Sequence, residues 1–118
     1  MPEDPAGVVR RYLALFEQRD GSRFHEVLAP NLQAYHPDGT LAFDGRDAWI
    51  ASHMEMDVRF VRVTEEDLLV DGDRVACRYR VEATLPDGRR VVSTGTKIYR
   101  LADGLITEIR GNDHSEVE

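Results

Sequence analysis

The sequence predicts an α+β protein in which helices of the first third cover an antiparallel sheet. Four Asp-Gly pairs follow the first two expected helices, and the last three, which begin at Asp71, Asp87 and Asp103, are evenly spaced. Both residue types tolerate the positive φ of a tight hairpin turn, so the pairs predict a meander. The intervening segments 73–86 and 89–102 are too long for flat strands. We therefore expect a bent sheet with a concave face that, under a helical lid, encloses a pocket.

Composition limits the possible classes of function. The 118 residues carry a net charge of −7 and no basic cluster, which argues against nucleic acid and anionic membranes as partners. Cys77 is the only cysteine, so an intrachain disulfide and a cysteine-based metal site are excluded. We expect one domain spanning 1–118, no signal peptide, and a cytoplasmic location.

The N-terminal third predicts two helices. Asp4 caps the first, Pro5 occupies its first turn, and apolar residues recur every three or four positions until Asp20-Gly21. Ser22 can cap a second, short helix, which Pro30 should end.

The middle of the chain predicts a hairpin, a third helix and a strand. Segment 32–36 is a strand candidate, and 41–43 can return as its partner across the turn that contains Gly39. A helix then starts at Asp44 or Gly45 and places Trp49, His53 and Met56 on one face. Segments 58–66 and 68–70 read as strand.

The C-terminal half predicts three strands. Alternation is clearest at 75–83, where Val75, Cys77 and Tyr79 face one way. Segment 91–101 follows, and its Gly95 predicts a bulge or bend. The last strand covers 105–113, and the tail 115–118 is expected to be frayed.

Several stretches resemble the nuclear transport factor 2-like superfamily, and within it the SnoaL-like polyketide cyclases and ketosteroid isomerases. The resemblance covers nearly the whole chain and rests on residues 9–15, 27–30, 34–39, 45–48 and 98–108. It implies a cone-shaped α+β barrel with N-terminal helices packed on a strongly curved antiparallel sheet around a mostly apolar pocket. It also implies a homodimer formed through the outer sheet face, without cofactor or metal. Fold alone leaves the function open.

The resemblance identifies two candidate catalytic residues and one position at which this sequence differs from the isomerases. His36 stands where the isomerases keep the aspartate that shuttles the proton, although it can equally be a turn histidine. Tyr12 matches their oxyanion-stabilising tyrosine, although a tyrosine on this helix face can equally pack in the hydrophobic core. Lys97 replaces their second oxyanion donor, an aspartic acid. If Lys97 points outward, Thr96 takes the inner face.

A carboxylate on the last strand is the third catalytic candidate. Asp113 lies on the inward face if Ile109 does, as in SnoaL-like cyclases, and a one-residue register change would substitute His114. The alternative is a solvated strand-end aspartate. The expected substrate-binding wall consists of Trp49, His53, Met56, Cys77, Tyr79, Lys97 and Ile109.

These residues support two classes of function. The first is a cofactor-independent enzyme that transfers protons on an apolar or aromatic carbonyl compound, as an isomerase or aldol-type cyclase. The second is a non-catalytic ligand-binding or dimerisation module, which the loss of both isomerase aspartates favours. Epoxide hydrolysis has less support, because the Asp-Arg-Asp set of such relatives is missing.

Overall fold

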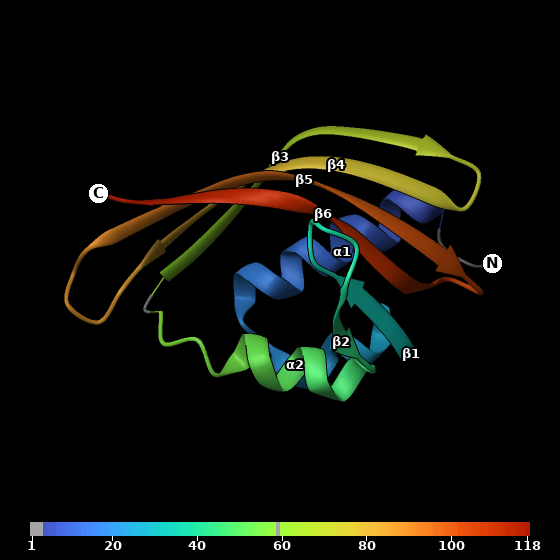
Figure 1. Cartoon of the computed structure of the whole chain (residues 1–118), viewed down its shortest axis with the longest axis horizontal. Helices are drawn as coiled ribbons and strands as arrows, with labels where there is room; N and C mark the ends of the chain where they lie inside the picture. Colours follow the sequence, from blue (N-terminus) through green and yellow to red (C-terminus); the bar gives the residue numbers. More distant parts are fainter. Residues whose placement is uncertain (1–3, 59) are drawn as a thin grey trace.

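The computed structural model describes residues 4–58 and 60–118, and it confirms the α+β class. Helices precede a six-stranded mixed sheet of order β2-β1-β6-β5-β4-β3, in which only β1 and β6 pair in parallel. Figure 1 shows α1 and α2 on the same side of the long strands. The elements are α1 (Pro5–Gln18), the 3₁₀-helix η1 (Gly21–Glu26), β1 (Leu28–Tyr35), β2 (Leu41–Asp44), α2 (Arg46–Met54), β3 (Phe60–Asp71), β4 (Arg74–Thr84), β5 (Arg90–Ala102) and β6 (Leu105–Val117).

Helix α1 begins and ends with local contacts. The Asp4 carboxylate accepts a hydrogen bond from the Gly7 amide at 2.7 Å, which confirms the predicted cap. Arg19 ends the helix in the left-handed region, with φ of 58°. Its guanidinium donates to the carbonyls of His53, Met54 and Met56, so the end of α1 is tied to the end of α2.

The predicted length of the second helix is wrong. Only the short η1 forms, capped by Asp20, and β1 already begins at Leu28. Leu28 is fully buried and lies opposite Ile106 of β6, a distant pairing that local periodicity does not reveal. Pro30 is exposed within β1, where the register with β6 shifts between Leu28 and Gln33. A proline is tolerated there because its missing N–H removes no ladder bond.

The Asp-Gly turns are confirmed. The glycines at 39, 72, 88 and 104 all have positive φ, between 61° and 90°. They join β1 to β2 and link β3, β4, β5 and β6 into a meander. The turns therefore set the register that decides which side chains share the concave face.

Two predictions about strand length are corrected. Residues 60–66 and 68–70 belong to one strand, β3, whose register shifts between Glu65 and Asp67; Val58 precedes this strand, and position 59 lies outside the described residues. The tail is paired rather than frayed, because β6 continues to Val117 along β5. The hydroxyls of Ser115 and Ser93 form a hydrogen bond of 2.6 Å, and the Glu118 amide donates to the Arg90 carbonyl.

The core lies between the helices and the concave face of the sheet. Four aromatic rings fill its centre, and Tyr12 touches the other three with centroid distances of 5.5 to 6.1 Å. These rings are Tyr12, Phe24, Trp49 and Tyr99. Among residues 4–58 and 60–118, no helix is long and apolar enough to cross a membrane.

Candidate functional site

A tyrosine and an aspartate meet on the concave face across three strands. Tyr79 of β4 lies opposite Gly95 of β5, and Gly95 lies opposite Asp113 of β6. The Tyr79 hydroxyl donates to Asp113 Oδ2 at 3.4 Å. Burial, and then the Asp113 charge, raise the pKa of Tyr79, so this hydroxyl keeps its proton and acts as the donor. The Asp113 side chain therefore lies on the same side of the sheet as Tyr79, although the residue is exposed, and His114 pairs with Glu116 instead.

Gly95 allows this contact by close approach rather than by a bulge. A Cβ built on Gly95 would lie 2.5 Å from the Asn112 carbonyl oxygen and 2.7 Å from the Asp113 Cβ. The β5–β6 register runs without a break past this point and shifts only between Arg100 and Leu101. Of the two predicted possibilities at Gly95, the bulge is therefore wrong and the bend stays a prediction; the glycine leaves Tyr79 and Asp113 free to interact.

Lys97 occupies the neighbouring position of the concave face. It lies opposite Cys77 on one side and Gly111 on the other, and it is half-buried, whereas Thr96 is exposed. Asp113 is thus a diagonal neighbour of Lys97, a relation that spans about 7–8 Å between backbones and is within reach of a long side chain. The ammonium and the carboxylate can act on one bound molecule.

His53 approaches this face from α2 in a defined tautomer. Its ring stacks on Trp49 at 3.9 Å and packs against Phe43 and Phe16 at 5.6 and 6.0 Å. Nδ1 lies 2.8 Å from the Trp49 carbonyl oxygen, which can only accept, so Nδ1 carries the proton and Nε2 is an acceptor. Burial lowers the pKa of His53, and the charge of Lys97 lowers it further.

This environment predicts a fluorescence titration. Trp49 is the only tryptophan, and a protonated imidazole stacked on an indole quenches its emission. We expect emission to fall with decreasing pH around a midpoint below the ordinary histidine value of 6.5. Lys97→Met should move the midpoint upward, because it removes a charge that opposes protonation.

His53→Gln should abolish this titration, whereas His25→Gln should leave it unchanged, since His25 is exposed and its Nδ1 lies 2.9 Å from the Ser22 carbonyl oxygen. A midpoint above 6.5 would contradict the assigned environment.

Four other predicted site residues, the catalytic candidate Tyr12 and three wall residues, belong to the packed interior. Tyr12 is 8% exposed, its pKa is raised by burial, and it shares a hydrogen bond with Tyr99. Its hydroxyl is thus engaged inside the ring cluster. Burial raises the pKa of the Cys77 thiol to about 11, so the thiol stays protonated. Trp49 and Ile109 are buried.

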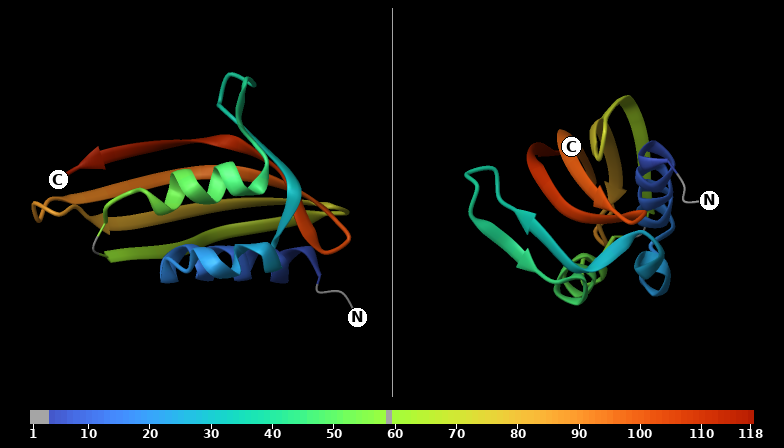
Figure 2. Two further views of the ribbon diagram at one scale, coloured as in Figure 1. Left: turned by 90° about the horizontal axis from the view of Figure 1, so that it is seen from below. Right: turned by 90° about the vertical axis from the view of Figure 1, so that its right-hand side faces the viewer.

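Two predicted site residues lie apart from this group. His36 is exposed at the start of the β1–β2 turn, where its amide donates to the Thr40 carbonyl at 2.8 Å. Figure 2 shows this hairpin projecting from the rest of the molecule. Met56 lies beyond the end of α2 and is 46% exposed. The geometry therefore joins Asp113 to Tyr79, places Lys97 two residues away on the same face, and puts His53 within electrostatic range of Lys97; it gives no support to a shared role for His36.

Sequence reasoning placed His53 in the substrate-binding wall and gave it no role in proton transfer. The four-residue spacing from Trp49 was the available signal, because it allows a helical histidine to donate to the carbonyl one turn earlier. No cluster of three potential ligands arranged for a metal ion occurs among the described residues.

Comparisons with known proteins agree with the fold. No curated protein matches the sequence, whereas many solved structures match. A Delta 5-3-ketosteroid isomerase from Mycobacterium sp. is 22% identical, with TM-score 0.79, over 96% of this chain and 97% of that one. IdmH from Streptomyces antibioticus, described as a candidate polyketide cyclase, is 22% identical, with TM-score 0.78, over 94% and 92%. A computationally designed 17-OHP binder is 19% identical, with TM-score 0.82, over 98% and 100%.

At these identities, the solved structures establish the nuclear transport factor 2-like fold and nothing finer. The model of the SnoaL-like domain matches residues 9–109, which is most of the chain, from within α1 to within β6. This chain is a member of the SnoaL-like domain family.

Proposed function

We propose that the concave face binds a small apolar or aromatic carbonyl compound and transfers a proton at the carbon beside its carbonyl. One observation carries this proposal: Asp113, held by Tyr79, shares the concave face with Lys97. A carboxylate is a general base, and a cation nearby favours the negative oxygen that forms when the base removes a proton.

Each group has a role in this reaction. The Asp113 carboxylate takes the proton as the carbon–hydrogen bond breaks, and the carbonyl becomes an enolate whose oxygen faces the Lys97 ammonium. The proton then returns to the same carbon or to a conjugated one, which gives exchange or isomerisation. His53 Nε2, as a neutral acceptor, would bind a hydroxyl of the substrate. Trp49, Phe43 and Phe16 surround the His53 ring, which favours an apolar or aromatic molecule at this end of the face.

Deuterium exchange tests the proposal without knowledge of the natural substrate. We expect the protein to accelerate loss of the α-proton signals of 2-tetralone in buffered D₂O, measured by proton NMR, with a rate that saturates in ketone concentration. The buffer alone supplies the reference rate. If the ketone quenches Trp49 emission but its exchange is not accelerated, the proposed proton transfer is overturned and only ligand binding is supported.

Non-catalytic binding on the same face is the second candidate. The exposed position of His36 favours it, because that residue stood where the isomerases keep their proton shuttle. The designed 17-OHP binder is a ligand-binding protein of this fold.

Homodimer formation and a cytoplasmic location stay predictions.

A further inference from the structure

Arg19 stands at a backbone position that does not suit an arginine. It ends α1 with φ of 58° and ψ of 35°, in the left-handed region. A residue with a Cβ is unfavourable there, and glycine is the usual residue at this kind of helix C-terminus. The nearest glycine, Gly21, comes two residues later. The contacts of the Arg19 side chain therefore have to offset the cost of its backbone conformation.

The Arg19 guanidinium binds three carbonyl oxygens at the end of α2. Nη1 donates to the His53 oxygen at 3.1 Å, and Nη2 donates to the Met54 and Met56 oxygens at 3.5 and 2.5 Å. The last carbonyls of a helix have no partner within it and carry partial negative charge, so a cation is favourable there. Since Met56 lies beyond α2, the guanidinium also holds the start of the connection to β3.

A packing contact brings the same two segments together. Gly21 begins η1, and a Cβ built on it would lie 2.9 Å from Met54 Cγ and 3.1 Å from Met54 Sδ. Because position 21 has no side chain, α2 can approach the chain that follows α1. The end of α2 is therefore located by packing at Gly21 and by hydrogen bonds at Arg19.

His53 depends directly on this arrangement. Its carbonyl accepts from Arg19 and its Nδ1 donates to the Trp49 carbonyl, so the residue is held both at its backbone and at its ring. The charged groups that act on the ring are Lys97 of β5 and Arg19 itself. Both charges oppose protonation of the ring, which keeps Nε2 an acceptor.

We propose that Arg19 is a positioning residue, which places the His53 ring so that Nε2 is presented to a ligand on the concave face. This inference rests on the function proposed above, in which Nε2 binds a hydroxyl of the substrate. Arg19 acts through His53 and needs no contact with the ligand. The ligands whose binding depends on Arg19 are then ketones that carry a hydroxyl group.

Arg19→Gly tests the positioning without a backbone penalty, because glycine is favoured in the left-handed region. We expect the midpoint of the Trp49 emission titration to rise toward 6.5, since a positive charge is removed. Its amplitude should fall, since His53 is no longer held on Trp49. Guanidinium ion at millimolar concentration should restore both, with sodium chloride at equal ionic strength as the reference. Circular dichroism melting shows whether the variant is folded.

Hydroxylated ketones test the consequence for binding. The probes are 2-tetralone and its 5-, 6- and 7-hydroxy derivatives, titrated into the protein and followed by amide chemical shifts in NMR. We expect at least one derivative to bind the parent protein about two- to tenfold more tightly than 2-tetralone, the gain from one hydrogen bond. Arg19→Gly should lose this preference and bind 2-tetralone within about twofold of the parent.

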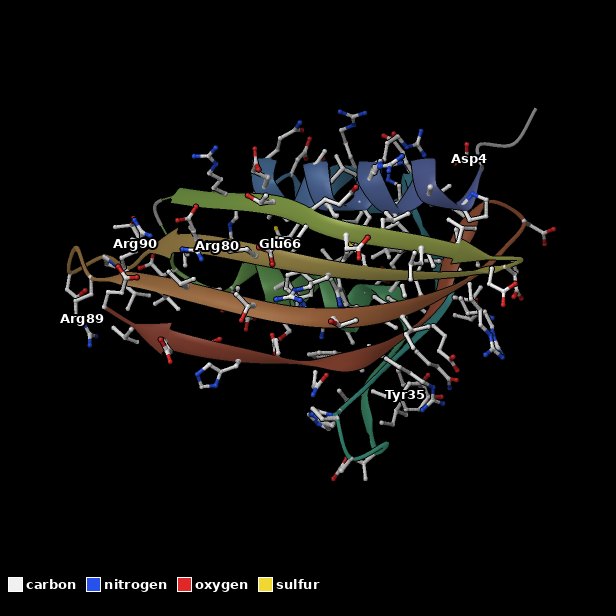
Figure 3. The ribbon with its side chains drawn as sticks, turned by 90° about the horizontal axis from the view of Figure 1, so that it is seen from above. Asp4, Tyr35, Glu66, Arg80, Arg89 and Arg90 are labelled. Atoms are coloured by element: carbon white, nitrogen blue, oxygen red, sulfur yellow. The ribbon has the colours of Figure 1, made fainter. Side chains whose placement is uncertain are left out.

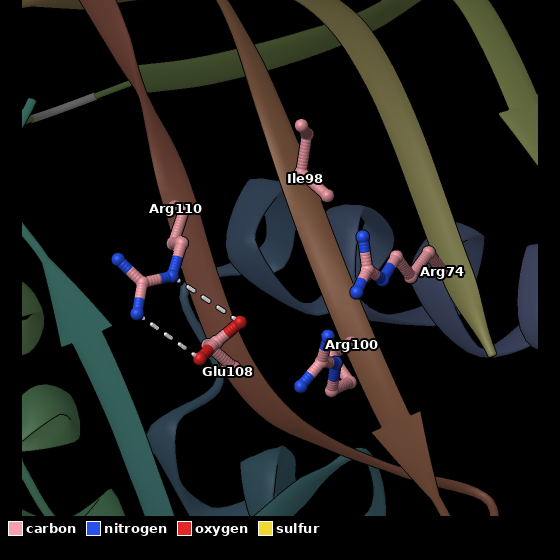
Figure 4. A pocket seen from close by; sticks show the side chains of 5 residues that line it. All are labelled: Arg74, Ile98, Arg100, Glu108 and Arg110. Atoms are coloured by element: carbon pink, nitrogen blue, oxygen red, sulfur yellow. Dashed lines mark hydrogen bonds and ion pairs between the residues drawn. The ribbon is translucent and has the colours of Figure 1, made fainter.

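Two arginines on the outer face of the sheet are controls for the loss of a charge. Arg80 of β4 has its Nη2 3.6 Å from Glu82 Oε1, and Figure 3 shows it among the side chains of the outer face. Arg110 of β6 contacts both carboxylate oxygens of Glu108 at 3.3 Å, as Figure 4 shows. Arg80→Gln and Arg110→Gln change the net charge as Arg19→Gly does. Both should leave the titration and the hydroxyl preference unchanged.

Three results would overturn the proposal. They are a titration like that of the parent in folded Arg19→Gly, no recovery with guanidinium ion, or the same change in the two control variants. If the first occurs while the parent still accelerates exchange of 2-tetralone, only the role of Arg19 is refuted. If guanidinium ion restores the titration but no hydroxylated ketone binds more tightly than 2-tetralone, Arg19 still positions His53, and the hydroxyl-binding role of His53 in the proposed function is refuted.

Discussion

Trp49→Ala is expected to lower the free energy of unfolding by about 3–5 kcal/mol, the usual cost of truncating a large buried aromatic side chain. Trp49 is only 2% exposed, and its ring contacts Phe24 at 5.0 Å and Tyr12 at 5.7 Å. The indole joins α2 to α1 and η1, so its loss opens a cavity where three helical segments meet. Urea denaturation followed by circular dichroism measures the effect, because the variant has no tryptophan to report on folding.

Leu69→Ala is the control for this measurement. Leu69 is 67% exposed on β3, and its truncation should change the unfolding free energy by less than about 0.5 kcal/mol. A loss below about 1 kcal/mol for Trp49→Ala would show that the ring cluster can collapse around the gap.

The sequence predicted the parts of the fold that depend on local chemistry. The Asp4 cap, the Asp-Gly turns and the alternation along β4 all follow from short-range rules, and all are confirmed. What the sequence did not predict depends on distant pairing. The parallel contact of Leu28 with Ile106 converts a helix-like segment to strand, and the pairing of Ser115 with Ser93 orders the tail.

The orientation of the candidate residues was predicted in part for the same reason. Asp113 was identified together with its alternative, His114, since strand parity left only a one-residue uncertainty. Continuous β5–β6 pairing past Gly95 decided it, and it also placed Lys97 rather than Thr96 inward. His36 was assigned a catalytic role because it occupies the position of the isomerases' proton-shuttling aspartate. Its orientation depends on how the turn closes, and here the Thr40 carbonyl accepts its amide at the base of an exposed hairpin.

Asp113→Asn is expected to slow the exchange of 2-tetralone α-protons by about 10²- to 10⁴-fold, the contribution of a positioned general base. The substitution keeps the shape of the side chain, and the amide oxygen can still accept the Tyr79 hydrogen bond. The amide cannot accept the substrate proton. The affinity for ketone, measured by Trp49 emission, should therefore change far less than the rate.

Asp47→Asn provides the matched control, since Asp47 has a side chain that is 98% exposed in the first turn of α2. Its exchange rate should equal that of the parent protein. A slower variant with an equally weakened affinity would make Asp113 a binding residue. An unchanged rate would remove it from the reaction, and the base would then have to be sought at His53, the other proton acceptor assigned to this face. The pH profile separates these cases: a His53 base would lose activity with the same midpoint that Trp49 emission reports, and Lys97→Met would move both midpoints together.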